Sequence, residues 1–154
     1  MKFSLEEYFR TDIDDETLRR MADAIVHCIN VKRGDAVWIR GGMHSWRLVE
    51  LVKLRLLKLG VSSTATLISD MYMEEAYRTV PEEFFKITPK EKLALAKSVD
   101  ACITIEYPWN PAIKQSFPRN KLSATAEGFH PIREVILNEK KWCYVGYPLS
   151  LIHI

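Results

Sequence analysis

The sequence is poor in the residues that most often build metal and covalent sites. Its 154 residues include three cysteines and four histidines. It has no His-Glu-x-x-His motif and no cysteine pair with zinc spacing, so neither common kind of zinc site is predicted. The cysteines Cys28, Cys102 and Cys143 are odd in number and each lies among apolar residues. This pattern predicts buried, reduced thiols in the cytoplasm and argues against a disulfide framework.

Long apolar runs and a strong excess of one charge are also missing. No apolar stretch reaches the roughly 20 residues that a membrane span needs. The start, MKFSLEEYFR, carries charges where a secretory signal needs an apolar run. The formal net charge is only +2, with basic and acidic residues interleaved, which argues against a nucleic-acid partner. We therefore expect a cytoplasmic protein whose partners include neither a membrane nor nucleic acid.

The clearest positive signal is a strand, helix, strand unit over residues 31–70. Residues 36–39 form a short, continuous apolar run, typical of a strand buried on both faces. Gly60 stands where a left-handed helix C-cap belongs, and the β-branched run 63–69 predicts the next strand. Between these strands, residues 45–59 predict a helix with an apolar stripe. The stripe consists of Trp46, Val49, Val52, Leu56 and Leu59.

Other helices are predicted from caps and apolar spacing. A helix with an apolar face over residues 18–29 has three candidate N-caps, Asp12, Asp14 and Asp15. Asp70 is the candidate cap of a helix over residues 71–79. Residues 88–91, Thr-Pro-Lys-Glu, predict a capping box with proline at the first helical position. Shorter helical segments are predicted at residues 3–10 and 82–86.

Two more strands complete the pattern. Residues 101–106 and 142–146 are predicted strands, and a Tyr-Pro pair follows each of them. Pro131 is expected to separate two helices, at residues 119–127 and 131–138. The alternation predicts an α/β fold, an open, mostly parallel, doubly wound sheet with helices on both faces. The expected strand order is 2-1-3-4.

Three features near the predicted strand ends are candidates for a site. The turn at residues 41–45 lies between a strand and a helix N-terminus, where doubly wound folds bind phosphate. It matches neither the dinucleotide pattern nor the P-loop, so a simple tight turn is the alternative. His44 and Ser45 offer a base and a nucleophile, but neighbours at a helix start point in different directions. Glu106 is either a functional carboxylate or a cap.

The remaining candidates have ordinary structural explanations. His27 has no second ligand at helical spacing and is expected to pack against the core, and His130 lies far from it in sequence. One aromatic and methionine-rich stretch suggests either a ligand surface or core and interface packing. It contains Met71, Tyr72, Met73 and Tyr77. No catalytic, cofactor-binding or metal-binding residue is therefore assigned.

The last six residues look foreign to the protein. Residues 149–154, LSLIHI, match the translation of CTGTCTCTTATACACATC, a transposase adapter used in sequencing libraries. On this interpretation the domain spans residues 1–148 and belongs to a longer protein. His153 is then excluded as a possible ligand.

Four stretches, taken in order, carry a family resemblance. They read LRRMADAIVHCINVKRGDAVWIRGG, RLVELVKLRLLKLGVSSTATLISD, ACITIE and KWCYVGYP. Together they resemble the N-terminal domain of the aminopeptidase T and aminopeptidase S family of dinuclear metallo-aminopeptidases. The resemblance covers most of residues 18–148 and rests on the order of the features, because no single motif is diagnostic.

The resemblance implies an exopeptidase that removes N-terminal residues from peptides with two divalent ions, zinc, cobalt or manganese. In that family the metal ligands belong to a later, C-terminal domain, so no catalytic residue carries over to this chain. The resemblance also implies a homodimer. This domain would pack against its missing C-terminal domain and form a wall of the active-site cleft.

Two alternatives stay open. The same fold family resembles dihydroxypyridine ring-cleaving dioxygenases, which use a single iron in the corresponding later domain. From a different class, the chain is a complete small-ligand-binding α/β module. Residues 41–45 and 107–111 would then form its crevice at the carboxyl ends of the strands.

Overall fold

The computed structural model describes residues 13–147. The helix expected at 3–10, the candidate cap Asp12 and the foreign-looking tail lie outside these residues. The described chain forms one parallel sheet, whose strands are β1 (Ala36–Gly42), β2 (Ser62–Ile68), β3 (Ala101–Ile105) and β4 (Lys141–Val145). The strand order is β2-β1-β3-β4, which confirms the predicted order.

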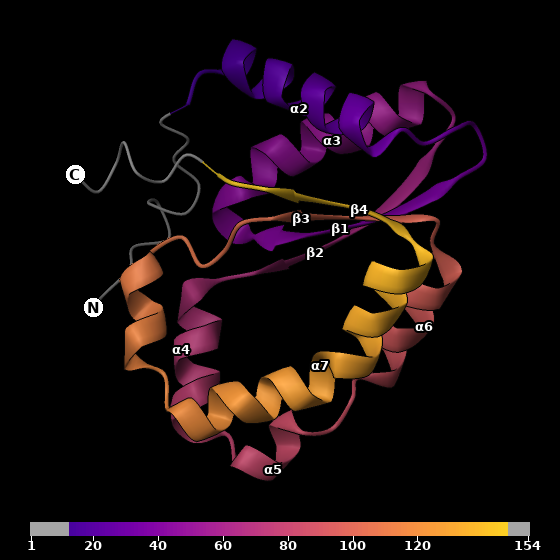
Figure 1. The fold of residues 1–154 in the computed structure, drawn as a ribbon. Coiled ribbons are helices and arrows are strands. Elements are labelled where there is room, and N and C mark those ends of the chain that lie inside the picture. Colours follow the sequence, from indigo (N-terminus) through magenta and orange to yellow (C-terminus); the bar gives the residue numbers. More distant parts are fainter. Residues whose placement is uncertain (1–12, 148–154) are drawn as a thin grey trace.

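Helices cover both faces of the sheet, which confirms the α/β, doubly wound prediction (Figure 1). One face carries α2 (Asp15–Ile29) and α3 (Trp46–Lys58). The other side holds four helices: α4 (Asp70–Thr79), α5 (Glu82–Phe85), α6 (Lys90–Ser98) and α7 (Arg119–Glu139). Short 3₁₀ turns, η1 (Met43–Ser45) and η2 (Pro111–Ser116), follow β1 and β3.

The apolar run of strand β1 is buried on both faces of the sheet. Val37 and Ile39 pack into the core under α2 and α3, while Trp38 belongs to the core under α6 and α7. Successive side chains of a strand point to opposite faces, so a strand covered on both faces buries all of them. Full burial of each such side chain stabilises the fold by about 1.5–3 kcal/mol.

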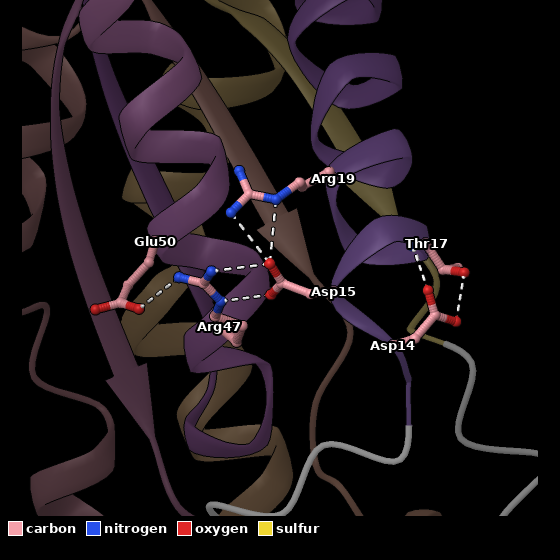
Figure 2. A network of polar contacts seen from close by, with 6 residues as sticks. All are labelled: Asp14, Asp15, Thr17, Arg19, Arg47 and Glu50. Atoms are coloured by element: carbon pink, nitrogen blue, oxygen red, sulfur yellow. Dashed lines mark hydrogen bonds and ion pairs between the residues drawn. The ribbon is translucent and has the colours of Figure 1, made fainter.

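The start of α2 follows the sequence prediction closely (Figure 2). Asp14 is the N-cap, and its carboxylate accepts hydrogen bonds from the Thr17 backbone N–H at 2.9 Å and the Thr17 hydroxyl at 2.8 Å. Both bonds hold the pKa of Asp14 below its usual value. Asp15 begins the helix and forms ion pairs with Arg19 and Arg47.

Helix α3 buries the centre of the predicted stripe, Val49, Val52 and Leu56. Trp46 is half-buried, whereas Leu59 is 48% exposed, so the predicted stripe was wrong at Leu59. The reason is that α2 lies beside α3 and turns the buried face toward itself as well as toward the sheet. Gly60 has φ +74°, which confirms the left-handed cap. The buried residues of α3 are Leu48, Val49, Leu51, Val52 and Leu56.

Helix α7 is continuous through Pro131, so the prediction of two helices was wrong. Proline removes one backbone hydrogen bond and disfavours the helix locally. Tertiary packing on both sides of the proline offsets that cost. Gly128 lies against the backbone of residues 85–87, and Ile132 and Ile136 are buried under the sheet.

Two predicted helix caps were also wrong. Ser69 caps α4 by accepting a hydrogen bond from the Tyr72 N–H at 3.1 Å, and Asp70 is instead the first helical residue. The capping box at residues 88–91 does not form, because α6 begins one residue later, with Pro89 at the N-cap. Proline has no N–H for a glutamate side chain to bind.

Candidate functional site

The carboxyl ends of β1 and β3 bring together the two stretches proposed as a crevice. A Cβ added at Gly42 would lie 3.1 Å from the Cβ of Tyr107, and one at Gly41 would lie 3.4 Å from the Cβ of Ile105. The turn at 41–45 and the segment after β3 are therefore in direct contact. Glycine is needed there because a side chain would separate the two segments.

Inside this turn, the two candidate catalytic side chains are buried and used for packing. The Ser45 hydroxyl donates to the Gly42 carbonyl at 2.7 Å. The His44 ring lies edge-on to Tyr147, with centroids 5.0 Å apart. Among residues 13–147 neither ring nitrogen of His44 has a hydrogen-bond partner of good geometry. His44 and Ser45 are thus not arranged as a base and its nucleophile.

Burial also decides the charge of His44. The loss of hydration lowers its pKa to about 4, and the neighbouring backbone of Glu106 opposes this only in part. The imidazole is therefore neutral at physiological pH. A neutral, buried ring fills the turn where phosphate was considered, and it brings no positive charge to an anion.

The carboxylate of Asp70 organises the loop after β3. It is 1% exposed and accepts two backbone hydrogen bonds, from the N–H of Trp109 and the N–H of Asn110, each at 2.9 Å. Burial raises its pKa, and these two bonds oppose the rise. Because both oxygens receive a donor, Asp70 fixes the start of α4 against the loop at the ends of the strands.

Glu106 has a similar role at the end of β4. Its Oε2 accepts a hydrogen bond from the Tyr147 N–H at 3.2 Å, and its own N–H donates to the Val145 carbonyl at 2.8 Å. Of the two interpretations weighed for this carboxylate, the capping one agrees with these contacts.

The expectation that all three cysteines are buried was wrong for Cys28, and the core position expected for His27 was also wrong. Both residues are exposed, because the helix buries Ile25, Val26 and Ile29 instead. Cys102 is buried, and burial raises the pKa of its thiol.

Two further groups complete the candidates. Cys143 on β4 is half-buried, and its pKa is raised by burial and by the thiol of Cys28 beside it. His130 is exposed on α7. In the described part of the chain, no group of three or more His, Cys, Asp or Glu side chains is placed to bind a metal ion. Within the same residues no helix is long and apolar enough to cross a membrane.

A groove of about 940 Å³ lies on the α6 and α7 side of the sheet, and we call it the aromatic groove. Its floor is formed by β1 and β2, and its walls by α4, α5, α6 and α7. The stretch that suggested either a ligand surface or packing lies here, since Met71, Tyr72, Met73 and Tyr77 all line it. Most of the other lining side chains are apolar, including Trp38, Phe84, Phe85 and Phe129.

Arg40 is the site residue that the sequence prediction missed. It lies on the central strand β1, in register with Thr66 of β2 and Thr104 of β3, and it lines the aromatic groove. The signal was visible as one cation at the end of the apolar run Ala-Val-Trp-Ile-Arg. A charge in a strand buried on both faces calls for a partner or an opening to solvent.

Comparison with known proteins gives a family and a fold. The model of the thermophilic metalloprotease family M29 matches residues 14–151. The solved structure of wild-type AmpT from Thermus thermophilus superposes with a TM-score of 0.73 at 17% identity. The match covers 86% of this chain and 36% of that one, so the chain spans about a third of AmpT.

The other comparisons add little. A putative transcription repressor of the LacI family from Corynebacterium glutamicum gives a TM-score of 0.37 at 8% identity, over 84% of this chain and 61% of that one. That score is too low to support an argument about fold or function. No curated protein matches the sequence.

Proposed function

The chain belongs to the thermophilic metalloprotease family M29, and from this membership we propose that it is the N-terminal part of a metallo-aminopeptidase. The full-length protein would remove N-terminal residues from peptides. The family match over residues 14–151 carries this proposal. The structural match covers only 36% of AmpT, which supports a catalytic domain in the part of the full-length protein that lies outside this chain.

The described side chains of this chain do not fit a two-metal centre. Residues 13–147 hold no cluster of three metal-binding side chains. Both oxygens of Asp70 receive backbone N–H groups, and His44 is enclosed among other side chains. We therefore assign the two divalent ions, zinc, cobalt or manganese, to the remainder of the full-length protein.

Exposed aromatic side chains on the edge strand β4 support a partner that covers this edge of the sheet. Trp142 and Tyr144 lie two residues apart on one face of β4 and are 54% and 59% exposed. Exposed aromatic side chains on an edge strand are typical of an interface. We propose that the absent C-terminal domain or a second subunit of a homodimer covers them, in a cytoplasmic enzyme.

The test compares the 154-residue chain with its full-length parent. Both are assayed with leucine p-nitroanilide and added zinc, cobalt or manganese, with a chelator-treated sample as the control. We expect only the full-length protein to hydrolyse this substrate. Its activity should be lost on chelation and restored by added metal. Metal-dependent turnover by the 154-residue chain would contradict the missing-domain proposal.

The metal content of the full-length protein separates the peptidase from the alternative enzyme. Two divalent ions per chain and peptide hydrolysis agree with the proposal. One iron per chain with cleavage of a dihydroxypyridine ring would replace it by the dioxygenase. Light scattering of the same preparation measures whether the protein is a dimer.

A further inference from the structure

The aromatic groove carries a positive charge but no negative one. Among the described residues that line it, Arg40 and Lys92 are the charged side chains, and none is acidic. Lys92 is exposed on α6, whereas Arg40 is half-buried on the central strand. The groove therefore has one fixed, partly desolvated cation at its floor.

Within residues 13–147, the direct contacts found for the guanidinium of Arg40 are with neutral groups. Its Nη2 donates to the Tyr107 hydroxyl at 3.2 Å. Its central carbon lies 4.5 Å from the ring centroid of Phe129 and 5.3 Å from that of Trp38, and the Cys102 thiol is also beside it. Arg40 forms no ion pair with any described carboxylate, although a guanidinium offers five donors in a planar fork.

The rest of the floor is fixed in place. The Trp38 Nε1–H donates to the Thr66 hydroxyl at 3.0 Å, which holds the indole against the sheet beside Arg40. On the opposite wall, Tyr77 stacks on Phe85 with centroids 5.1 Å apart, and its hydroxyl donates to Thr125. These contacts leave an apolar, aromatic space next to one cation.

We propose that the aromatic groove binds an organic carboxylate with an apolar or aromatic body. The Arg40 guanidinium holds the carboxylate through two parallel hydrogen bonds, and the aromatic walls receive the body. A single fixed cation matches the one negative charge of a carboxylate better than it matches the charge of a phosphate ester. The nearby glycine turn is filled by its own His44 and Ser45 and does not present a phosphate cradle.

This site goes beyond the proposed peptidase activity, because it needs only residues of this chain and no metal. Two sources supply the same chemistry: a free aromatic acid, or the C-terminal carboxylate of a short peptide. N-acetylphenylalanine represents the first source and the tripeptide Ala-Ala-Phe the second. The C-terminal amide of each compound lacks the carboxylate and is its control.

The experiment is isothermal titration calorimetry on the 154-residue chain in a metal-free buffer. We expect at least one of the two acids to bind, and its amide to bind about tenfold more weakly or not at all. Arg40→Met should weaken acid binding by about tenfold or more and leave amide binding unchanged. Arg55→Met, on the opposite side of the sheet, is the matched control and should bind like the wild type.

A second variant separates loss of the site from loss of the fold. Tyr107→Phe removes the hydroxyl that positions Arg40 and should weaken acid binding a few-fold, with an unchanged circular dichroism spectrum. Equal binding of acid and amide, full acid binding by Arg40→Met, or no binding of either acid by the folded wild type would overturn the proposal. If only Ala-Ala-Phe binds, the groove takes peptide ends. If N-acetylphenylalanine binds as well, it accepts free acids.

Discussion

The guanidinium of Arg47 on α3 holds both carboxylate oxygens of Asp15 on α2. Its Nε lies 2.8 Å from Oδ1 and its Nη2 lies 3.1 Å from Oδ2 (Figure 2). Asp15 is the first residue of its helix, where a negative charge is favourable. The pair therefore links the beginnings of two neighbouring helices that cover the same face of the sheet.

Asp15→Asn should lower the thermal midpoint at pH 7, and the difference from the wild type should be smaller at pH 3. The hydrogen bond from Arg47 holds the pKa of Asp15 below its usual value of 3.8. Its stabilisation is therefore present above that value and is lost as the pH falls through the lower folded-state pKa. Thermal unfolding followed by circular dichroism measures both midpoints. Glu16→Gln, which affects an exposed pair with Arg20, is the control and should change little.

Protonation of His44 should destabilise the protein in a different pH range. Its pKa falls from 6.5 to about 4 on burial, so between these values the unfolded chain binds a proton that the folded chain does not. The free energy of unfolding should then decrease by about 3 kcal/mol between pH 7 and pH 4. Urea unfolding at several pH values measures this slope.

His44→Leu should remove most of that slope, whereas His130→Gln, at an exposed position, should keep it. A wild-type free energy of unfolding that is flat from pH 7 to pH 4.5 would contradict the neutral, buried state of His44.

Gly128→Ala should destabilise the protein by about 1–3 kcal/mol. An added Cβ would clash with the Phe85 carbonyl oxygen and lie 3.1 Å from the Lys86 carbonyl carbon. Helix propensity alone predicts the opposite sign, because alanine favours a helix over glycine by about 1 kcal/mol. Gly146→Ala is the control, since its nearest atom would be 3.8 Å away. Denaturant unfolding measures the stability of both variants. A Gly128→Ala variant that is more stable than the wild type would contradict the close packing of α7 against residues 85–87.

Asp70→Ala should cost about 3 kcal/mol of unfolding free energy, because the backbone N–H groups of Trp109 and Asn110 lose a buried acceptor. Asp70→Asn keeps one carbonyl oxygen and should fall between the alanine variant and the wild type. Chemical unfolding at pH 7 measures all three proteins. An alanine variant as stable as the wild type would mean that the loop after β3 does not depend on this carboxylate.

The sequence predicted the architecture well because strand and helix periodicity is local information. The apolar run before Arg40, the cap at Asp14 and the left-handed Gly60 all occur as expected. The strand order follows from connections that cross over to parallel neighbours. What failed depended on packing between distant segments. Helix α7 stays intact at Pro131 because residues 85–87 and the sheet hold both of its halves.

The site was less predictable than the fold, for a related reason. Proximity in sequence suggested His44 with Ser45, but the fold uses both for packing. The aromatic groove instead combines β1, α4, α5 and α7, which no single stretch of sequence reveals. Arg40 was readable as an oddity within an apolar strand, although its ring neighbour Phe129 lies 89 positions later in the chain.

The position of Arg40 has a consequence for engineering. Its strand is hydrogen-bonded to a neighbour on each side, so the cation is mounted on the most constrained part of the sheet. The opposite wall comes from α4 and the single turn of α5, which carry exposed side chains such as Tyr72 and Phe84. Arg40 and the wall formed by α4 and α5 can therefore be varied separately. A library restricted to the facing positions of α4 and α5 should alter selectivity for the apolar body while the carboxylate contact is retained.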